Sequence, residues 1–223
     1  MEMIDLRRED GTKTGEVKER TLVHRDGDLH GTSHVWLVRY RPSTGSADVL
    51  LQKRSADKDS FPGYYDISSA GHIPAGQDFL ESAVRELKEE LGVEAAPEDL
   101  HFLFTHLGYH EQEFYGKLFK NHEYSRVYLY ECDRPEGEFR IQKSEVESVR
   151  WMDYRECLDG IRNATLKHCI FPDEFEKLAE SLEQYFAETG RPLACASRTE
   201  TWAQDAQEEL EDWIEEQGIY IRQ

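Results

Sequence analysis

The segment at residues 71–93, GHIPAGQDFLESAVRELKEELGV, constrains the fold of this chain more than any other stretch. Asp78, with Glu81 three residues later, resembles a capping box at the start of a helix. Gly92 is well placed to end that helix, because glycine readily adopts the left-handed conformation found after many helices. The pattern therefore predicts a helix over residues 79–91 that is entered from a loop.

The side chains of this predicted helix divide into an apolar stripe and an acidic fan. At about 100° per residue, one stripe collects the side chains of Leu80, Val84, Leu87 and Leu91. Glu86, Glu89 and Glu90 gather on a different side, near the C-terminal end, where like charges repel and the helix dipole disfavours anions. Two interpretations are open: a solvated face, helped by pairing of Arg85 with Glu89, or a site that holds a cation.

The chain is strongly acidic, and this limits its partners. Lys plus Arg number 27 and Asp plus Glu number 46, which gives a formal net charge of -19. We therefore expect neither nucleic-acid binding nor an anionic membrane surface as partner, and an anionic substrate needs a local basic patch or a metal. The sequence has no apolar run of about 18 residues and no CxxC pair. We expect a cytoplasmic protein with free thiols.

The first two thirds of the sequence predict strands around the helix. Runs at 34–40 and 47–54 flank the turn sequence PSTGS and predict a β-hairpin. Further strands are predicted at 64–69, 101–107, 125–131 and 146–152.

After Cys157 the sequence changes in character. Residues 175–186 and 202–214 place apolar side chains at helical spacing in two acidic helices. We therefore predict one mixed α/β domain at residues 1–165 and a helical C-terminal extension at 166–223. Three roles are open for the extension: it covers the sheet, closes a pocket or forms the surface of a homodimer.

The segment at 71–93 resembles the Nudix box, a pattern of spaced Gly, Glu, Arg and apolar positions. The matching residues are Gly71, Arg85, Glu86, Leu87, Glu89, Glu90, Gly92 and Val93. The departure is Gln77, which stands where the family has its first Glu and leaves the partner of Arg85 open. The resemblance implies a Nudix α/β/α sandwich around a mixed β-sheet, an α/β (α+β) fold in which the box forms a loop, a helix and a loop.

The same resemblance implies a hydrolase with Arg85, Glu86, Glu89 and Glu90 as catalytic residues. It also implies Mg²⁺ or Mn²⁺ held by the three glutamates, and hard oxygen ligands suit these ions. The implied substrate is a small molecule, a nucleoside diphosphate linked to another moiety, cleaved by attack of water on phosphorus with Glu89 or Glu90 accepting the proton. Outside the box, Glu123 is either a further metal ligand or base, or a surface charge at a strand edge.

A wider stretch, roughly residues 20–155, resembles the branch of Nudix proteins related to type I isopentenyl diphosphate isomerase. The resemblance is carried by HRDGDLHGTSHVWLV, LLQKRSADKDSFPGYYDISSAGH and NHEYSRVYLYE. Those isomerases use a basic stretch on the substrate diphosphate, which implies substrate-binding roles for Lys53, Arg54 and Lys58. We expect Gly71 and His72 in the same substrate site. The alternative for the three cations is a set of exposed charges that blunt a strand end.

Histidines and a missing thiol leave two functional questions open. The isomerases bind a metal partly through histidines near His24, His30, His34 and His72, which implies a second metal site; structural histidines are the alternative. The isomerases also use a cysteine close to the position of Ala70 to move protons at a carbon centre, and this chain has no cysteine there. Hydrolysis is therefore the preferred interpretation. The alternatives are an isopentenyl diphosphate isomerase-like enzyme and a nucleotide-binding module whose catalysis is weakened by Gln77.

Overall fold

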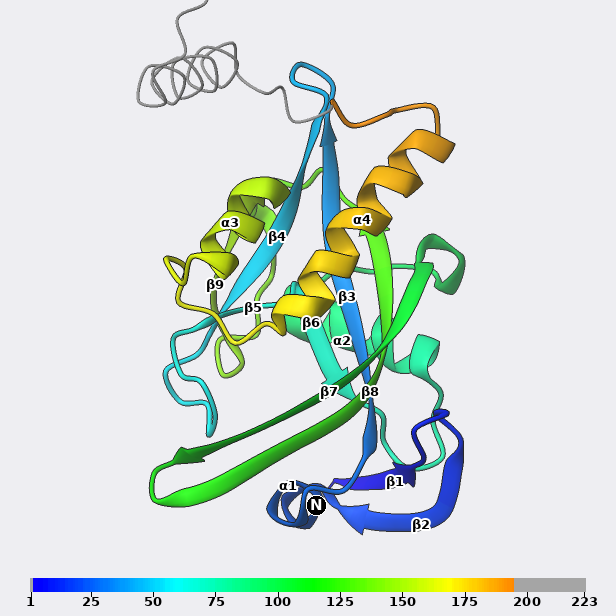
Figure 1. Ribbon diagram of the computed structural model, residues 1–223, viewed down its shortest axis with the longest axis vertical. Coiled ribbons are helices and arrows are strands. Elements are labelled where there is room, and N and C mark those ends of the chain that lie inside the picture. The colour runs from blue at the N-terminus through cyan, green and yellow to red at the C-terminus, as the bar shows by residue number, and fades with distance from the viewer. Residues whose placement is uncertain (1, 195–223) are drawn as a thin grey trace, which may run out of the picture.

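The computed structural model describes residues 2–194, which form a mixed β-sheet with helices on both faces (Figure 1). Within these residues the nine strands are β1 (Met3–Arg7), β2 (Lys13–Glu19), β3 (His30–Arg41), β4 (Ser46–Arg54), β5 (Tyr65–Asp66), β6 (Ser69–His72), β7 (His101–Phe114), β8 (Lys117–Glu131) and β9 (Val146–Asp153). The helices are α1 (Arg20–Asp26), α2 (Phe79–Leu91), α3 (Tyr154–Arg162) and α4 (Pro172–Glu188), with short 3₁₀ turns η1 (Pro97–Asp99) and η2 (Glu136–Glu138). This architecture confirms the predicted sandwich.

Strand β3 organises the sheet, because most other strands are placed relative to it. It pairs antiparallel with β1, β4 and β6, and parallel with β8, while β4 also pairs with β5 and β9. His30 lies beside Glu123 of β8, and His34 lies beside Ala70 of β6. Segments far apart in the sequence therefore meet at the N-terminal half of β3. Strands β7 and β8 form a long hairpin that extends past the rest of the sheet (Figure 1).

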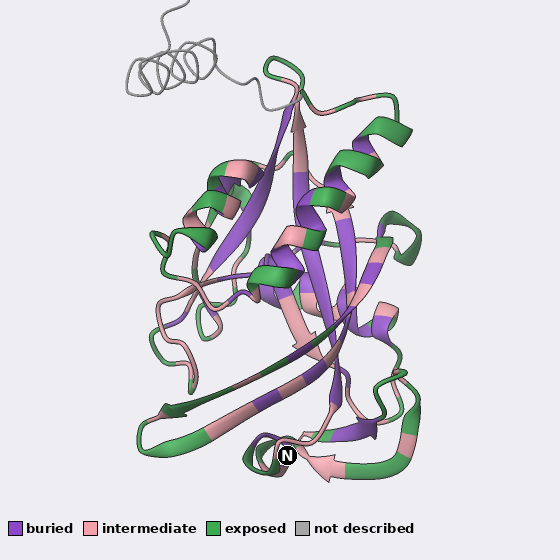
Figure 2. Cartoon of the chain, viewed as in Figure 1, coloured by how far each residue is buried: buried purple, intermediate pink, exposed green. Residues whose placement is uncertain are grey.

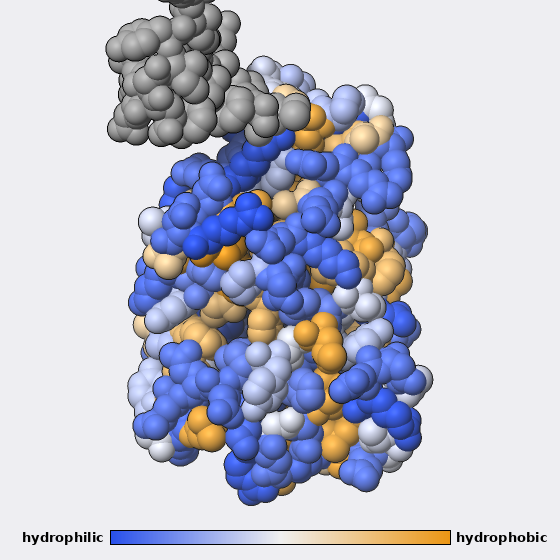
Figure 3. Space-filling model, viewed as in Figure 1, coloured by the Kyte–Doolittle hydropathy of each residue, from blue (hydrophilic) through white to orange (hydrophobic). Residues whose placement is uncertain are grey.

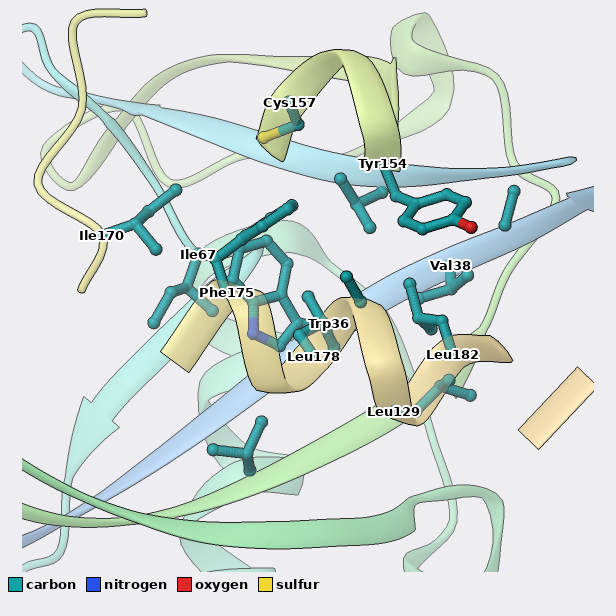
Figure 4. Packing of buried hydrophobic residues seen from close by; sticks show 14 of the residues in the cluster. Trp36, Val38, Ile67, Leu129, Tyr154, Cys157, Ile170, Phe175, Leu178 and Leu182 are labelled. Carbon is teal, nitrogen blue, oxygen red and sulfur yellow. The ribbon is translucent and has the colours of Figure 1, made fainter. Parts of the chain in front are cut away.

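Alternating side chains of the central strands pack into two hydrophobic cores, one on each face of the sheet. On β3, Trp36 and Val38 point to the face covered by α3 and α4, where Phe175 of α4 lies against Trp36 (Figure 4). Val35 and Leu37 point to the opposite face, which α2 covers. Figure 2 shows the central strands buried along most of their length. Burial on both faces explains why these strands are apolar without alternation.

Helix α2 begins and ends where its sequence predicts. The Asp78 carboxylate accepts a hydrogen bond of 2.7 Å from the backbone N–H of Phe79. Gly92 follows the helix with φ 64°, in the left-handed region, and its N–H donates to the carbonyls of Leu87 and Lys88.

The buried side of α2 is wider than the predicted apolar stripe. Phe79 and Ala83 are buried in line with Leu87 and Leu91, whereas the side chains at positions 80 and 84 are half-buried. Leu80 and Val84 nevertheless pack against the same core, so the predicted stripe lies on the side of α2 that faces the sheet. Glu90 is buried on this helix as well, and its carboxylate accepts a hydrogen bond from Ser69 of β6.

The sequence predicts the central strands and α4 better than it predicts the N-terminal segment. Strands β1 and β2 and helix α1 were not predicted, because this segment is charged and β2 is mostly exposed. The predicted hairpin is confirmed by β3 and β4, and the predicted helix at 175–186 by α4. The predicted helix at 202–214 lies outside the described residues.

Hydrophilic residues cover most of the face seen in Figure 3, with smaller groups of hydrophobic residues among them. No helix within residues 2–194 combines the length and the hydropathy that crossing a membrane requires.

Candidate functional site

A hollow that we call the carboxylate pocket lies between α2, β6 and the segment after β4. Its charged lining includes Glu86, Glu89, Glu90, Arg20, Lys58 and Arg85. Helical spacing directs the three carboxylates to this side of α2. Gly71 of β6 also lines the pocket, and a side chain at this position would overlap the carboxyl group of Glu86. Any larger residue at position 71 would therefore displace the Glu86 carboxyl group from its place in the pocket.

Burial changes the charge state of the inner carboxylates. Glu90 is 5% exposed, and the Ser69 hydroxyl donates a hydrogen bond of 2.9 Å to its Oε2. Burial, reinforced by the neighbouring Glu86 carboxylate, raises the pKa of Glu90 to about 8. Burial also raises the pKa of Glu86. A divalent cation in the pocket would offset this burial and favour the ionised forms of both groups.

Arg85 obtains its partners from the box itself. Its guanidinium lies 2.7 Å from Glu86 Oε1 and 3.1 Å from Glu89 Oε2, and it donates to the carbonyl of His72 at 3.5 Å. Gln77, at the departure from the family pattern, accepts instead from the Ser82 hydroxyl at 3.5 Å. Two of the three box glutamates are therefore engaged with Arg85.

Beside this pocket, three histidines converge. His24 of α1, His30 of β3 and His72 of β6 form the histidine cluster, and their candidate ligand atoms all lie within 4.8 Å of one another. The Nδ1 atoms of His24 and His30 lie 3.2 Å from the Lys120 carbonyl and 2.9 Å from the Asp28 carbonyl. If both Nδ1 atoms carry the proton that these carbonyls accept, both Nε2 atoms have a lone pair. The Nε2 of His24 lies 3.0 Å from the Nε2 of His72, whereas the Nε2 of His30 is buried without a partner.

The histidine cluster is uncharged at neutral pH. Burial lowers the pKa of His24 to about 4 and that of His30 to about 3, and it lowers the pKa of His72 well below its ordinary value. Neutral imidazole is the form that binds metal ions. The arrangement therefore suits a divalent transition-metal ion, and of the four histidines considered from sequence it unites three.

The fourth, His34, belongs to a different group. Its Nδ1 lies 3.0 Å from both carboxylate oxygens of Glu174 on α4, and its Nε2 lies 3.9 Å from Glu123 Oε2. Burial alone would lower the pKa of His34, but the Glu174 and Glu123 carboxylates outweigh it and raise this pKa to about 9. His34 and Glu123 line a second hollow, the histidine pocket, together with His24 and His72. Glu123 thus lies with the histidines and outside the lining of the carboxylate pocket.

The three cations considered for substrate binding occupy different places. Lys58 lines both pockets and pairs with Glu145. Arg54 lines the histidine pocket and forms an ion pair of 2.8 Å with Asp66. Lys53 points to β9, where its Nζ lies 2.8 Å from Glu147.

Sequence reasoning missed several residues of the site. Arg20 lines both pockets, like Lys58, Gly71 and His72. The histidine pocket also has an aromatic wall of Phe61, Phe119 and Phe171, next to the thiol of Cys169. These residues come from four separate segments, so no local spacing could have identified them.

Comparisons with known proteins agree with the box. The model of the NUDIX domain matches residues 30–170. Nudix hydrolase 3 of Arabidopsis thaliana is 43% identical over 157 residues, which cover 70% of this chain and 20% of that protein. An uncharacterized Nudix hydrolase of Clostridium acetobutylicum is 32% identical over 169 residues, which cover 72% of this chain and 77% of that protein. The chain therefore spans about a fifth of the Arabidopsis relative.

Solved structures agree in fold. A protein of Deinococcus radiodurans superimposes with a TM-score of 0.61 at 19% identity, over 79% of this chain and 98% of that one. At this identity the likeness bears on the fold alone. The domain match spans more than half of the chain and includes the whole box, so this protein belongs to the Nudix hydrolase family.

Proposed function

We propose that this protein is a metal-dependent hydrolase that cleaves a diphosphate linkage in a nucleoside diphosphate linked to another moiety, by attack of water on phosphorus. The observation that carries the proposal is the meeting of Glu86, Glu89 and Glu90 in one pocket with the cations Arg20 and Lys58. Acidic and basic side chains in one hollow suit a substrate whose phosphate oxygens contact both a metal ion and protein cations.

Nudix hydrolases generally use divalent metals such as Mg²⁺. We propose Mg²⁺ or Mn²⁺ here, with Glu86, Glu89 and Glu90 as the residues that would hold it. The raised pKa of buried Glu90 and the oxygen donors of all three residues support this fit. When bound, such a cation neutralises charge on a diphosphate and makes a water molecule more acidic.

The side chains of the pocket then have distinct roles in hydrolysis. Arg20 and Lys58 bind phosphate oxygens from the side shared with the histidine pocket, and Arg85 stabilises the negative charge on the oxygens of the phosphoryl group under attack. The oxygen of a water molecule forms a bond to phosphorus while the bond to the bridging oxygen breaks. Glu89 or Glu90 accepts the proton that the water loses.

We also propose that the histidine cluster binds a second divalent cation. The free Nε2 of His30 and the neutral state of the three rings support this site. Because Gly71 and His72 line both pockets, a diphosphate can extend from one pocket to the other. The second cation would then bind the far phosphate group.

Isomerisation of a prenyl diphosphate is the second candidate, and one observation favours it. Cys169 lines the histidine pocket, on the same wall as Ile170 and Phe171, although Ala70 lacks a thiol. Burial raises the pKa of the Cys169 thiol well above its ordinary value, so the group is a neutral thiol at pH 7. A neutral thiol can donate a proton to carbon but is a poor base, and we therefore rank hydrolysis first.

The test is a panel of nucleoside diphosphate compounds and isopentenyl diphosphate, assayed with Mg²⁺, with Mn²⁺ and with EDTA in H₂¹⁸O. Metal-dependent release of a phosphorylated product that carries ¹⁸O on phosphorus is the expected result. Conversion of isopentenyl diphosphate to its isomer without hydrolysis would reject the hydrolase in favour of the isomerase. Binding of a panel member without any turnover would favour a binding module.

A further inference from the structure

A chain of carboxylates and imidazoles crosses the interface between α4 and the sheet. Glu174, in the first turn of α4, is fully buried, and both of its carboxylate oxygens lie 3.0 Å from Nδ1 of His34. Its Oε2 also lies 3.3 Å from Nδ1 of His106 on β7. His106 Nε2 in turn lies 3.0 Å from Asp173, whose side chain is 73% exposed.

The other end of this chain reaches the histidine pocket. The Nε2 edge of His34 lies 3.3 Å from the Thr32 hydroxyl and 3.9 Å from Oε2 of Glu123. Glu123 is 8% exposed and lines the pocket with His34. The ring of His34 therefore lies between a carboxylate that faces the pocket and a carboxylate that belongs to α4.

Attachment of α4 to the sheet does not by itself require Glu174. Phe175, Leu178, Leu182 and Phe186 of this helix are fully buried in the core (Figure 4). A buried carboxylate among them carries a desolvation penalty that an apolar side chain would avoid. The first turn of a helix reduces that penalty but does not explain why the carboxylate faces His34.

We propose that Glu174 is a positioning residue that fixes the His34 ring, so that the ring in turn holds the Glu123 carboxylate at the wall of the histidine pocket. This inference rests on the proposed function and adds to it Glu123, which lines the histidine pocket, as a further ligand or base of the site. Glu174 acts through His34 and does not contact the substrate. Without it, the Nδ1 of His34 loses its carboxylate partner, and Glu123 keeps its hydrogen bond with Asn121 but no longer faces a fixed, charged ring.

The test is a double-mutant cycle with Glu174→Gln and Glu123→Gln, assayed on the compound that the panel identifies. Glu174→Gln keeps the volume of the side chain and removes its charge. We expect it to lower kcat about tenfold, the lower end of the range for residues that support a ligand, with KM changed less than twofold. In the Glu123→Gln background the same substitution should lower kcat less than twofold, because the two residues act as a unit.

A matched control separates positioning from attachment of α4. His106→Gln removes the other partner of Glu174 and leaves the contact with His34, so its kcat should stay within twofold of the parent value. If Glu174→Gln does not fold, His34→Gln takes its place in the cycle. The ¹⁵N signals of the His34 ring, assigned by their absence in His34→Gln, should shift in Glu174→Gln and not in His106→Gln.

Additive losses in the cycle, equal losses in Glu174→Gln and His106→Gln, or unchanged His34 ring signals in Glu174→Gln would each overturn the positioning role while hydrolysis by the parent protein persists. A parent protein that hydrolyses no compound of the panel overturns the proposed function, and the positioning role with it.

Discussion

The carboxylate pocket and the histidine pocket adjoin, yet they are built in opposite ways. Three carboxylates of the first come from one helix within five residues, and Glu89 among them has a side chain that is 53% exposed. The histidine cluster beside the second draws on α1, β3 and β6, and His24 and His30 in it are buried. Lys58 and Arg20 line both pockets.

Burial moves the titrating groups of the two regions towards their neutral forms, with opposite consequences for a cation. The pKa of Glu90 rises to about 8, so this group must lose a proton before it can bind a cation at neutral pH. The pKa values of His24 and His30 fall, so these rings are already in their metal-binding form. Cation binding in the carboxylate pocket should therefore strengthen as pH rises towards 8, while binding at the histidine cluster should change little above pH 5.

The largest expected effect comes from a substitution that impairs the carboxylate pocket and leaves the histidine cluster intact. Glu90→Gln should lower kcat by about 10³-fold, which corresponds to about 4 kcal/mol of lost transition-state stabilisation. Glu81→Gln, an exposed position on the same helix, is the matched control and should keep kcat within twofold. Steady-state kinetics and circular dichroism of both variants check this. Equal activity of Glu90→Gln and the parent would remove Glu90 from the site.

The next effect concerns the histidine pocket, where His34 makes the free energy of unfolding depend on pH. The pKa of His34 is about 9 in the folded protein, against an ordinary value of 6.5, so the folded state binds more protons between these limits. The stabilisation is complete below pH 6.5 and is lost as pH rises through 9, a change on the order of 3 kcal/mol. Urea unfolding of the metal-free protein between pH 6 and 10 should show this fall.

Glu90 also contributes a loss of stability with rising pH, between 4.5 and about 8, because its pKa is raised as well. The contribution of His34 is therefore the difference in the free energy of unfolding between the parent and His34→Gln. For His34→Gln, this free energy should change less with pH above 6.5. His101→Gln, at an exposed position of β7, is the control and should leave the slope unchanged. Parallel curves for the parent and His34→Gln would mean that Glu174 and Glu123 do not hold a charged ring.

The difference between the pockets also decides what the sequence could predict. Helix spacing alone brings Glu86, Glu89 and Glu90 together, so a contiguous segment contained the information for the three carboxylates, although not for Arg20 and Lys58 of the same pocket. The histidine cluster depends on pairing of β3 with β6 and on the position of α1, a long-range arrangement that no window of sequence contains. Glu174 lies 140 residues from His34, and its helix was predicted without any sign of its polar contact.

Removal of the cation tests the histidine side directly. At a Mn²⁺ concentration about 100 times the dissociation constant, binding should stabilise the folded state by about 2.7 kcal/mol. That stabilisation corresponds to a rise in Tm of roughly 5–10 °C for a domain of this size. In Glu90→Gln, where the carboxylate pocket is impaired, EDTA should still lower Tm. Adding His30→Asn should abolish that response, and adding His101→Asn should not. A persistent response in the His30→Asn variant would mean that the cation binds elsewhere.

The smallest effect concerns the place where the carboxylate pocket departs from its family. Gln77 now accepts only a 3.5 Å hydrogen bond from Ser82, while Arg85 pairs with Glu86 and Glu89. Gln77→Glu should draw Arg85 away from those two carboxylates and leave them free for a cation. Because an exposed ion pair contributes about 0.2–1 kcal/mol, we expect kcat/KM to rise by about two- to fivefold.

Gln142→Glu is the control for this last variant, since it adds the same charge at a position that lines the carboxylate pocket. It should not raise kcat/KM. An equal rise in both variants would assign the effect to the added charge, and no rise in either would mean that the pairing of Arg85 with Glu86 and Glu89 does not limit catalysis. A rise in Gln77→Glu alone would show that pairing with Arg85 limits the activity of the carboxylate pocket. The histidine cluster has no such limit at His30, whose Nε2 has no partner.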